Sequence, residues 1–159
     1  MVAFRKLTGE DFPLMLEWLA KSHVKEWWND GDDTIEKVAL HFGEEEWSVK
    51  RFILFETENG KALGYFQYYF ADDGSIGIDQ FIGEEDHTNR GVGTRAIKKF
   101  VKMIFKKHRP PRIFLDPSPA NKRAIRCYEK VGFAHYKTVI KESGERAFMM
   151  QIKRSDFQN

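Results

Sequence analysis

The sequence predicts an α+β fold, built on one central, mixed but mostly antiparallel sheet of about seven strands that is flanked by helices. Three observations lead to this prediction. The elements follow the order strand, helices, three strands, helix, strand, helix and two strands. Short turn signals join the three middle strands as a meander of hairpins. A strand–helix–strand unit comes next, and such a crossover joins neighbouring parallel strands.

Each element rests on a local pattern of apolar residues. The expected strands are residues 2–7, 51–56, 62–70, 75–83, 112–115, 133–140 and 146–153. The expected helices are residues 12–19, 23–28, 33–41, 92–105 and 119–130.

Capping residues define where the first helices begin. Thr8 with Asp11 resembles a capping box ahead of the first helix, with Asp in place of the usual Glu. Asp33 with Glu36 is the expected cap of the third helix.

Turn residues define the other boundaries. The Asn-Gly pair at 59–60 tolerates positive φ and predicts a hairpin, and residues 72–74 and 142–144 predict two further turns. The Pro-Pro pair at 110–111 stops the long helix. Gly132 is the expected terminal residue of the helix that follows.

The composition is that of one folded domain spanning residues 1–159. Hydrophobic residues make up 42% of the chain, which is enough for a single sizeable core. The one cysteine excludes an internal disulfide. The N-terminus lacks the apolar segment of a leader peptide, and no apolar run approaches the ~20 residues of a membrane span. We therefore expect a soluble, cytoplasmic protein.

Charge is unevenly distributed along the chain. Residues 1–86 hold 8 of the 26 Lys and Arg residues and 19 of the 24 Asp and Glu residues, a net charge of −11. Residues 87–159 have a net charge of +13. This asymmetry indicates two ligands of opposite sign or a nucleic-acid-binding half, and two oppositely charged solvated faces are the simpler alternative.

A glycine-rich turn at residues 89–94 precedes the long amphipathic helix. Gly91 and Gly93 let backbone N–H groups approach an anion, and the helix N-terminus adds its dipole. Arg90 and Arg95 add formal charge. The spacing is neither that of a dinucleotide fingerprint nor that of a P-loop. By itself, the turn fits a pyrophosphate site and a plain glycine cap equally well.

About 30 residues further on lies a second motif around Tyr128: Asn121-Lys-Arg-Ala124-Ile-Arg-Cys-Tyr128-Glu-Lys-Val-Gly132-Phe133. In this order and at this spacing, the two motifs resemble the GCN5-related N-acetyltransferase (GNAT) superfamily. Further segments resemble the aminoglycoside 6′-N-acetyltransferases, a group linked to antibiotic resistance: residues 16–19, 22–23, 26–28, 64–67, 77–81 and 116–130.

The resemblance implies acetyl-CoA as co-substrate. The residues from 90 to 94 hold the pyrophosphate through backbone amides, and the pantetheine arm pairs with the strand at residues 80–82. The superfamily usually has Gln or Arg where this chain has Thr88. The residues implied in acetyl-CoA binding are Gln80, Phe81, Ile82, Thr88, Asn89, Arg90, Gly91, Val92, Gly93, Thr94, Asn121 and Ala124.

The resemblance also implies two catalytic side chains. Asp79 is the base that deprotonates and orients the incoming ammonium. Tyr128 is the acid that protonates the leaving thiolate, which is already a tolerable leaving group because a free thiol has a pKa of about 8.5. Cys127 has no His–acid partner in the sequence pattern and is more typical of a small packed residue, so we expect direct transfer.

The acceptor implied is a polycationic amine bound by Trp27, Trp28, Asp79 and Asp116. Asp116 supplies a second carboxylate, and a Trp forms an aromatic wall. Adjacent Trp residues cannot share one helix face, so at most one of them lines the site. The related enzymes carry a longer acidic, Trp-containing insertion where this chain has only residues 71–75, which removes potential acceptor contacts.

Other interpretations remain open. The same scaffold could acylate a siderophore precursor, a polyamine or a protein amine. A nucleic-acid-binding module is disfavoured because the basic half lacks an aromatic RNA-binding stripe. The retained Asp79 and Tyr128 argue against a silent acyl-CoA sensor. Scattered histidines without a Cys/His cluster predict no metal. We expect no nucleic-acid or membrane partner, and a monomer or homodimer.

Overall fold

The computed structural model describes residues 1–43, 48–88 and 91–157, and these residues form a seven-stranded mixed sheet of order β1-β2-β3-β4-β5-β7-β6. The strands are β1 (Val2–Lys6), β2 (Val49–Glu56), β3 (Ala62–Phe70), β4 (Ile76–Ile82), β5 (Arg112–Leu115), β6 (Ala134–Ile140) and β7 (Arg146–Lys153). β4 and β5 are parallel, whereas β1–β2, β5–β7 and β6–β7 are antiparallel. The predicted fold class is therefore confirmed, and the bounds of β3, β5 and β7 agree with the sequence-based ones.

The chain divides into two compact units. The first comprises residues 1–68 and 79–90, and the second comprises residues 69–78 and 91–159. β3 and β4 each contribute residues to both units. Parallel pairing of β4 with β5 covers two residue pairs, Ile76 with Ile113 and Gly77 with Phe114.

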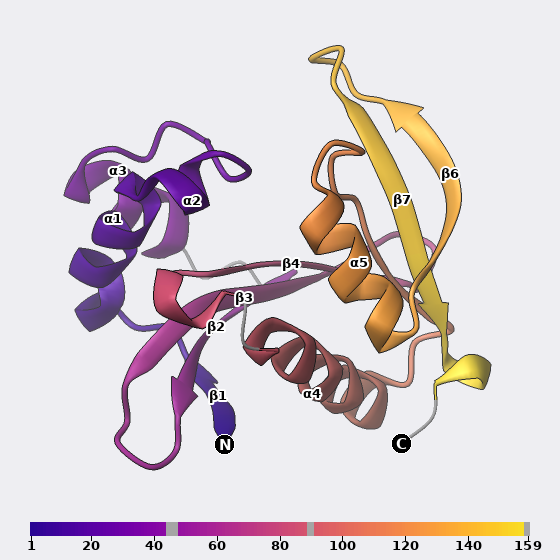
Figure 1. Ribbon diagram of the computed structural model, residues 1–159, viewed down its shortest axis with the longest axis horizontal. Coiled ribbons are helices and arrows are strands. Elements are labelled where there is room, and N and C mark those ends of the chain that lie inside the picture. Colours follow the sequence, from indigo (N-terminus) through magenta and orange to yellow (C-terminus); the bar gives the residue numbers. More distant parts are fainter. Residues whose placement is uncertain (44–47, 89–90, 158–159) are drawn as a thin grey trace. The chain divides into compact units, whose positions relative to one another are not determined.

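In the first unit, three helices gather around one apolar core. They are α1 (Phe12–Ala20), α2 (Ser22–Lys25) and α3 (Ile35–Gly43), and Figure 1 shows them close together in indigo and violet. Two short 3₁₀ turns, η1 (Gly9–Asp11) and η2 (Glu85–His87), complete this unit. The buried residues of its core are Met15, Trp18, Leu19, Val24, Val38, Phe42, Ile53 and Tyr65.

The N-terminal caps agree only partly with the sequence prediction. The Thr8–Asp11 capping box is confirmed, with the Thr8 N–H donating to Asp11 Oδ2 at 2.9 Å, although it opens η1 rather than α1 itself. The predicted Asp33 cap of α3 is wrong. Thr34 Oγ1 accepts from the Lys37 N–H at 3.2 Å, because α3 begins at Ile35.

Close backbone approach fixes the pairing of β3 with β4 in the first unit. The Gly83 N–H donates to the Leu63 carbonyl at 2.8 Å. A Cβ added to Gly64 would clash with the Phe81 carbonyl oxygen and would lie 3.1 Å from Ile82 Cα. Only glycine therefore fits at position 64 without a backbone shift.

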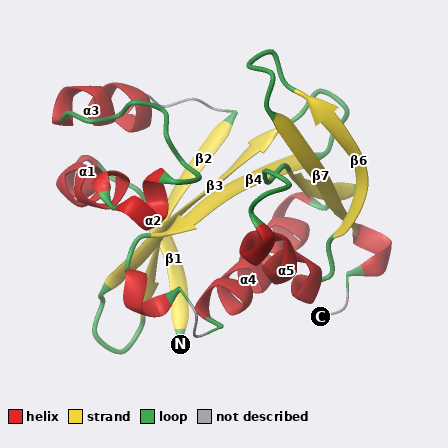
Figure 2. Cartoon of the chain, turned by 45° about the horizontal axis from the view of Figure 1, so that its top comes forward, coloured by secondary structure: helices red, strands yellow, loops and turns green. Residues whose placement is uncertain are grey.

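The second unit is built on α4 (Val92–His108) and α5 (Lys122–Val131), which pack together, and on the β6–β7 hairpin. Figure 2 shows this hairpin as a long pair of strands, which is followed by η3 (Arg154–Asp156). α4 follows the predicted apolar spacing. Its buried residues are Val92, Ala96, Ile97, Phe100, Val101, Ile104 and Phe105.

α5 begins later than predicted. The sequence-based start at Pro119 is wrong, because Asn121 caps the helix and the first helical residue is Lys122. Gly132 ends α5 as predicted, with φ of 122°. The N–H groups of Gly132 and Phe133 donate to the Tyr128 carbonyl at 3.2 and 3.0 Å.

Replacement of Gly64 by Ala should destabilise the protein by about 1–3 kcal/mol, because the new Cβ overpacks against the backbone of β4. Urea unfolding measures this free energy. Gly9→Ala is the matched control, since its Cβ would meet nothing closer than Phe12 Cε2 at 3.8 Å. Equal stability of the two variants would contradict the close approach.

Candidate active site

Asp79 lies on β4, in the first unit, and is held by a side chain of the neighbouring strand. Gln67 Nε2 donates to Asp79 Oδ2 at 3.3 Å. The Tyr65 hydroxyl in turn donates to Gln67 Oε1 at 2.7 Å. Tyr65 and Gln67 are two residues apart on β3, so they share a face of the sheet. The structure thus places the predicted base in a hydrogen-bonded series.

Tyr65 is fully buried, and burial is the main reason why the pKa of its phenol is raised far above its ordinary value. The carboxylate of Asp79 raises this pKa further, whereas the charge of Arg51 and its hydrogen bond to the phenol lower it. The Tyr65 hydroxyl therefore keeps its proton across the physiological pH range.

Of the two predicted tryptophans, one is packed and one is exposed. Trp28 packs against the core, with its ring edge-to-face against Tyr65 at 5.8 Å and against Phe81 at 5.3 Å. Trp27 is 45% exposed. The two adjacent rings thus lie in different environments, although both follow the end of α2 at Lys25 and so do not belong to one helix. The role of either ring toward an acceptor stays a prediction.

The end of β4 is anchored from the helical side. The Phe81 ring also contacts Trp18 at 6.1 Å. His23 Nε2 lies 3.0 Å from the Ile82 carbonyl oxygen, which places the donor nitrogen of the imidazole there. This carbonyl belongs to the segment from Gln80 to Ile82 that the sequence assigns to pantetheine pairing, so one backbone acceptor of the segment already has a partner.

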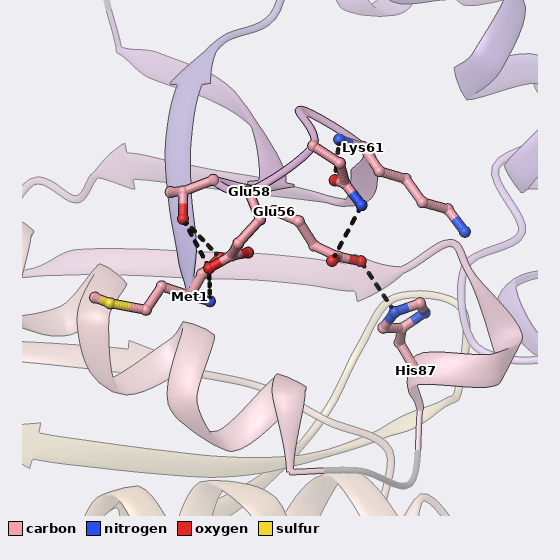
Figure 3. A network of polar contacts seen from close by, with 7 residues as sticks. Met1, Glu56, Glu58, Lys61 and His87 are labelled. Carbon is pink, nitrogen blue, oxygen red and sulfur yellow. Dashed lines mark hydrogen bonds and ion pairs between the residues drawn. The ribbon is translucent and has the colours of Figure 1, made fainter.

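The 3₁₀ turn that leads toward the glycine motif is tied to β2 (Figure 3). His87 Nε2 lies 3.2 Å from Glu56 Oε1. Thr88 follows, and its hydroxyl donates to the Glu85 carbonyl at 2.8 Å, so it serves to close the turn. Asn89 and Arg90, both predicted to bind acetyl-CoA, lie outside the described residues.

At the start of α4, Gly91 adopts the left-handed conformation, with φ of 73°. A Cβ at this position would be strained and would lie 3.0 Å from an Arg95 guanidinium nitrogen. Val92 is buried as the first helical residue. Gly93 has more space for a side chain, because an added Cβ would meet only Cys127 Sγ at 3.8 Å.

Thr94 and Cys127 connect α4 to α5. Thr94 Oγ1 lies 3.2 Å from Cys127 Sγ. Burial raises the pKa of the Cys127 thiol, and this outweighs the opposing effect of the Thr94 hydrogen bond. A thiol that stays protonated is a poor nucleophile, which agrees with the expected direct transfer.

Tyr128, the predicted acid, lies in the second unit, on α5. Its half-buried ring packs edge-to-face against Phe133 at 6.1 Å. Asn121 lies at the N-terminus of the same helix, where its Oδ1 accepts from the Ala124 N–H at 3.4 Å. Asn121 therefore has a structural role that its sequence-based assignment to acetyl-CoA binding did not include.

Asp116 follows β5 and is paired within the protein. Its Oδ2 lies 3.5 Å from Lys141 Nζ, and the two side chains are 30% and 47% exposed. The next carbonyl, that of Pro117, accepts from the Phe148 N–H at 2.8 Å and so attaches this turn to β7. The Lys141 ammonium thus pairs with the carboxylate that the sequence-based prediction assigns to the ammonium of the substrate.

Positive charge gathers along α4. A hollow of about 600 Å³ in the second unit is lined mainly by cations of this helix. The lining residues are Arg95, Lys98, Lys99, Lys102, Met103, Lys106 and Phe157. This arrangement favours anions near α4, as the charge asymmetry of the sequence predicts.

Two features were missed from the sequence. Asp30, Asp32 and His41 offer ligand-type atoms within 4.8 Å of one another, although His41 Nδ1 already contacts Asp32 Oδ2 at 2.7 Å. The Tyr65–Gln67 pair was noticed only as part of a resemblance. Its alternate spacing on a strand was the available signal, because such spacing places both side chains on one face.

Comparison with known proteins identifies the family. A family model described as an acetyltransferase (GNAT) domain matches residues 8–141. This chain therefore belongs to the GNAT family of acetyltransferases, and the resemblance inferred from its motifs is confirmed.

Within that family, the chain is similar to aminoglycoside N(6′)-acetyltransferase type 1 of Klebsiella pneumoniae. The two are 33% identical over 172 aligned positions, which cover 97% of this chain and 84% of that protein. A crystal structure of an aminoglycoside acetyltransferase in complex with coenzyme A and kanamycin superposes with a TM-score of 0.86 at 33% identity, covering 98% and 96% of the two chains. A spermine/spermidine N(1)-acetyltransferase of Bacillus subtilis is 25% identical over 91 residues, 56% of this chain and 59% of that one.

Among the residues that the structure describes, no helix has both the length and the apolar character required to span a membrane.

Replacement of Asn121 by Ala should lower the free energy of unfolding by about 1 kcal/mol, because α5 loses its N-cap acceptor. Asn121→Asp should retain most of the stability, since a carboxylate also caps. Thermal unfolding compares the variants, and calorimetric titration with coenzyme A separates the cap from a binding role. An alanine variant of unchanged stability would disprove the capping role.

Proposed function

We propose that this protein transfers the acetyl group of acetyl-CoA directly to a primary amine of a polycationic acceptor, with aminoglycosides as the acceptor class. The observation that carries this proposal is the similarity, over nearly the whole chain, to aminoglycoside 6′-N-acetyltransferases. The acidic first half of the chain suits a polycation, and the basic second half suits the phosphates of coenzyme A.

The residues present fit acetyl-CoA as co-substrate. Gly91 in the left-handed conformation opens α4, a helix of 17 residues whose first N–H groups have no intrahelical acceptor. Such an N-terminus binds phosphate oxygens through backbone amides and the helix dipole. The cations of α4, including Arg95 and Lys98, add charge of the required sign.

In the proposed reaction, Asp79 takes a proton from the acceptor ammonium, directly or through water. The amine nitrogen then attacks the thioester carbonyl carbon and forms a C–N bond, and the carbonyl electron pair moves to oxygen. When this pair returns, the C–S bond breaks and the thiolate receives the Tyr128 proton. The tyrosinate regains a proton from the new amide nitrogen. The products are the acetylated amine, free coenzyme A and one released proton.

The acceptor range depends on carboxylates outside β4, and in this chain some of them are already paired. In the short β3–β4 connection, hydrogen bonds from Ser75 and a contact with Arg112 lower the pKa of Asp73 to about 2. The Asp73 carboxylate thus stabilises the turn through these contacts within the protein. The 172 aligned positions exceed the 159 residues of this chain, so the Klebsiella relative carries extra residues. We infer a narrower set of acceptor contacts here.

A polyamine is the second candidate acceptor, because of the similarity to a spermine/spermidine acetyltransferase. Spermidine and an aminoglycoside share closely spaced ammonium groups, so the acidic half of the chain attracts both. They differ in rigidity and in the presence of sugar rings. A direct comparison of turnover therefore decides between them.

Release of coenzyme A should be strong with kanamycin or tobramycin and weak with spermidine or a lysine peptide. Asp79→Asn and Tyr128→Phe should each lower kcat by about 10²–10⁴-fold, because each removes one proton-transfer group. Asp86→Asn, an exposed carboxylate on η2, is the control. Efficient turnover of spermidine alone would identify a polyamine, and not an aminoglycoside, as the acceptor. Full activity of both variants would contradict the proposed roles of Asp79 as base and Tyr128 as acid.

Replacement of Lys141 by Ala should lower the KM for kanamycin by up to about fivefold, because it frees Asp116 from an exposed ion pair of modest strength. The KM for acetyl-CoA should not change. Lys153→Ala removes the same charge from another exposed position and serves as the control. If both substitutions lowered the KM for kanamycin equally, the change in net charge would explain the effect, and release of Asp116 would not.

A further inference from the structure

We propose that Tyr65 and Gln67 are positioning residues for the transfer reaction, and that they orient the Asp79 carboxylate through a directional series of hydrogen bonds. This inference rests on the proposed function, because it assumes that Asp79 is the base. The series runs from the Tyr65 hydroxyl to Gln67 Oε1 over 2.7 Å, and from Gln67 Nε2 to Asp79 Oδ2 over 3.3 Å.

Chemistry fixes the direction of the series. A phenol has a single proton, and the Tyr65 hydroxyl donates it to Gln67 Oε1. The carbonyl of the Gln67 amide thus faces Tyr65, which leaves the NH₂ group to face Asp79.

The series supplies Asp79 with a hydrogen-bond donor. The Gln67 NH₂ group donates and does not accept, so Asp79 Oδ2 accepts, as a carboxylate oxygen does. A base must be an ionised carboxylate when the acceptor ammonium arrives. The contact also fixes Oδ2 in space, and proton transfer depends on such geometry.

Packing keeps the series in place. Tyr65 is fully buried, and its ring lies 5.7 Å from Phe81, which is two residues from Asp79 on β4. Trp28 packs on both of these rings. The core therefore holds the Tyr65 hydroxyl in place. Gln67 is the one flexible side chain that links this fixed hydroxyl to the Asp79 carboxylate.

The first test replaces each member while retaining its volume. Gln67→Met should lower kcat by about 10- to 100-fold, the effect expected from a lost hydrogen bond to a charged group. Tyr65→Phe should lower kcat by about 2- to 10-fold, because its hydroxyl bonds the neutral amide of Gln67. The KM for acetyl-CoA should stay within about twofold. Tyr68→Phe is the control, because Tyr68 is a buried tyrosine on the opposite face of β3. Thermal unfolding and coenzyme A binding confirm that each variant is folded.

The second test uses double variants, because contact through a shared partner predicts non-additive effects. In the Asp79→Asn background, Gln67→Met should lower kcat less than twofold further. In the Gln67→Met background, Tyr65→Phe should likewise have almost no effect. Full, additive losses in these backgrounds would overturn the positioning role and indicate a merely structural one.

The outcomes distinguish this inference from the proposed function. If Asp79→Asn abolishes turnover while folded Gln67→Met and Tyr65→Phe retain full kcat, the positioning role is overturned and the proposed base remains. If Asp79→Asn retains full activity, the base assignment fails and this inference fails with it. A raised KM for acetyl-CoA at unchanged kcat would also overturn the positioning role.

Discussion

The antiparallel register between β3 and β4 is the constraint on which the candidate site depends. Tyr65 contacts Phe81, and Gln67 contacts Asp79, so the two contacts follow one register. Gly64 permits the close approach that this register requires. A shift of one residue would turn every side chain of one strand to the opposite face. Such a shift would separate Asp79, the proposed base, from Gln67 and place aromatic rings in water.

Much of the fold could be predicted from local patterns, whereas pairings across strands could not. Turn residues and apolar alternation located β3, β5 and β7 to the residue, because those signals are contained in the strands and their ends. The start of α5 was misplaced, since Pro119 is permitted in a first helical turn but Asn121 is the better cap.

The same distinction explains what could be predicted of the site. Asp79 and Tyr128 belong to contiguous motifs, so a resemblance could identify them as candidates. The Gln67–Asp79 contact depends on register, and the Asp116–Lys141 pair joins residues far apart in the sequence. Neither pair can be recognised from the sequence pattern of a single segment. Charge asymmetry was visible in the composition, but its concentration along one face of α4 needed the helix to be in place.

The candidate groups differ in how firmly they are held, and this difference has a functional meaning. Asp79 lies on a strand and is hydrogen-bonded through Gln67 to the buried Tyr65, so its position is linked to the core. Asp116 lies in a turn, and its partner Lys141 is half exposed. Groups that perform the chemistry need a fixed geometry, whereas groups that select the acceptor can change without loss of the reaction. A scaffold of this kind keeps one type of transfer while its acceptor varies, which fits a family whose members act on both aminoglycosides and polyamines.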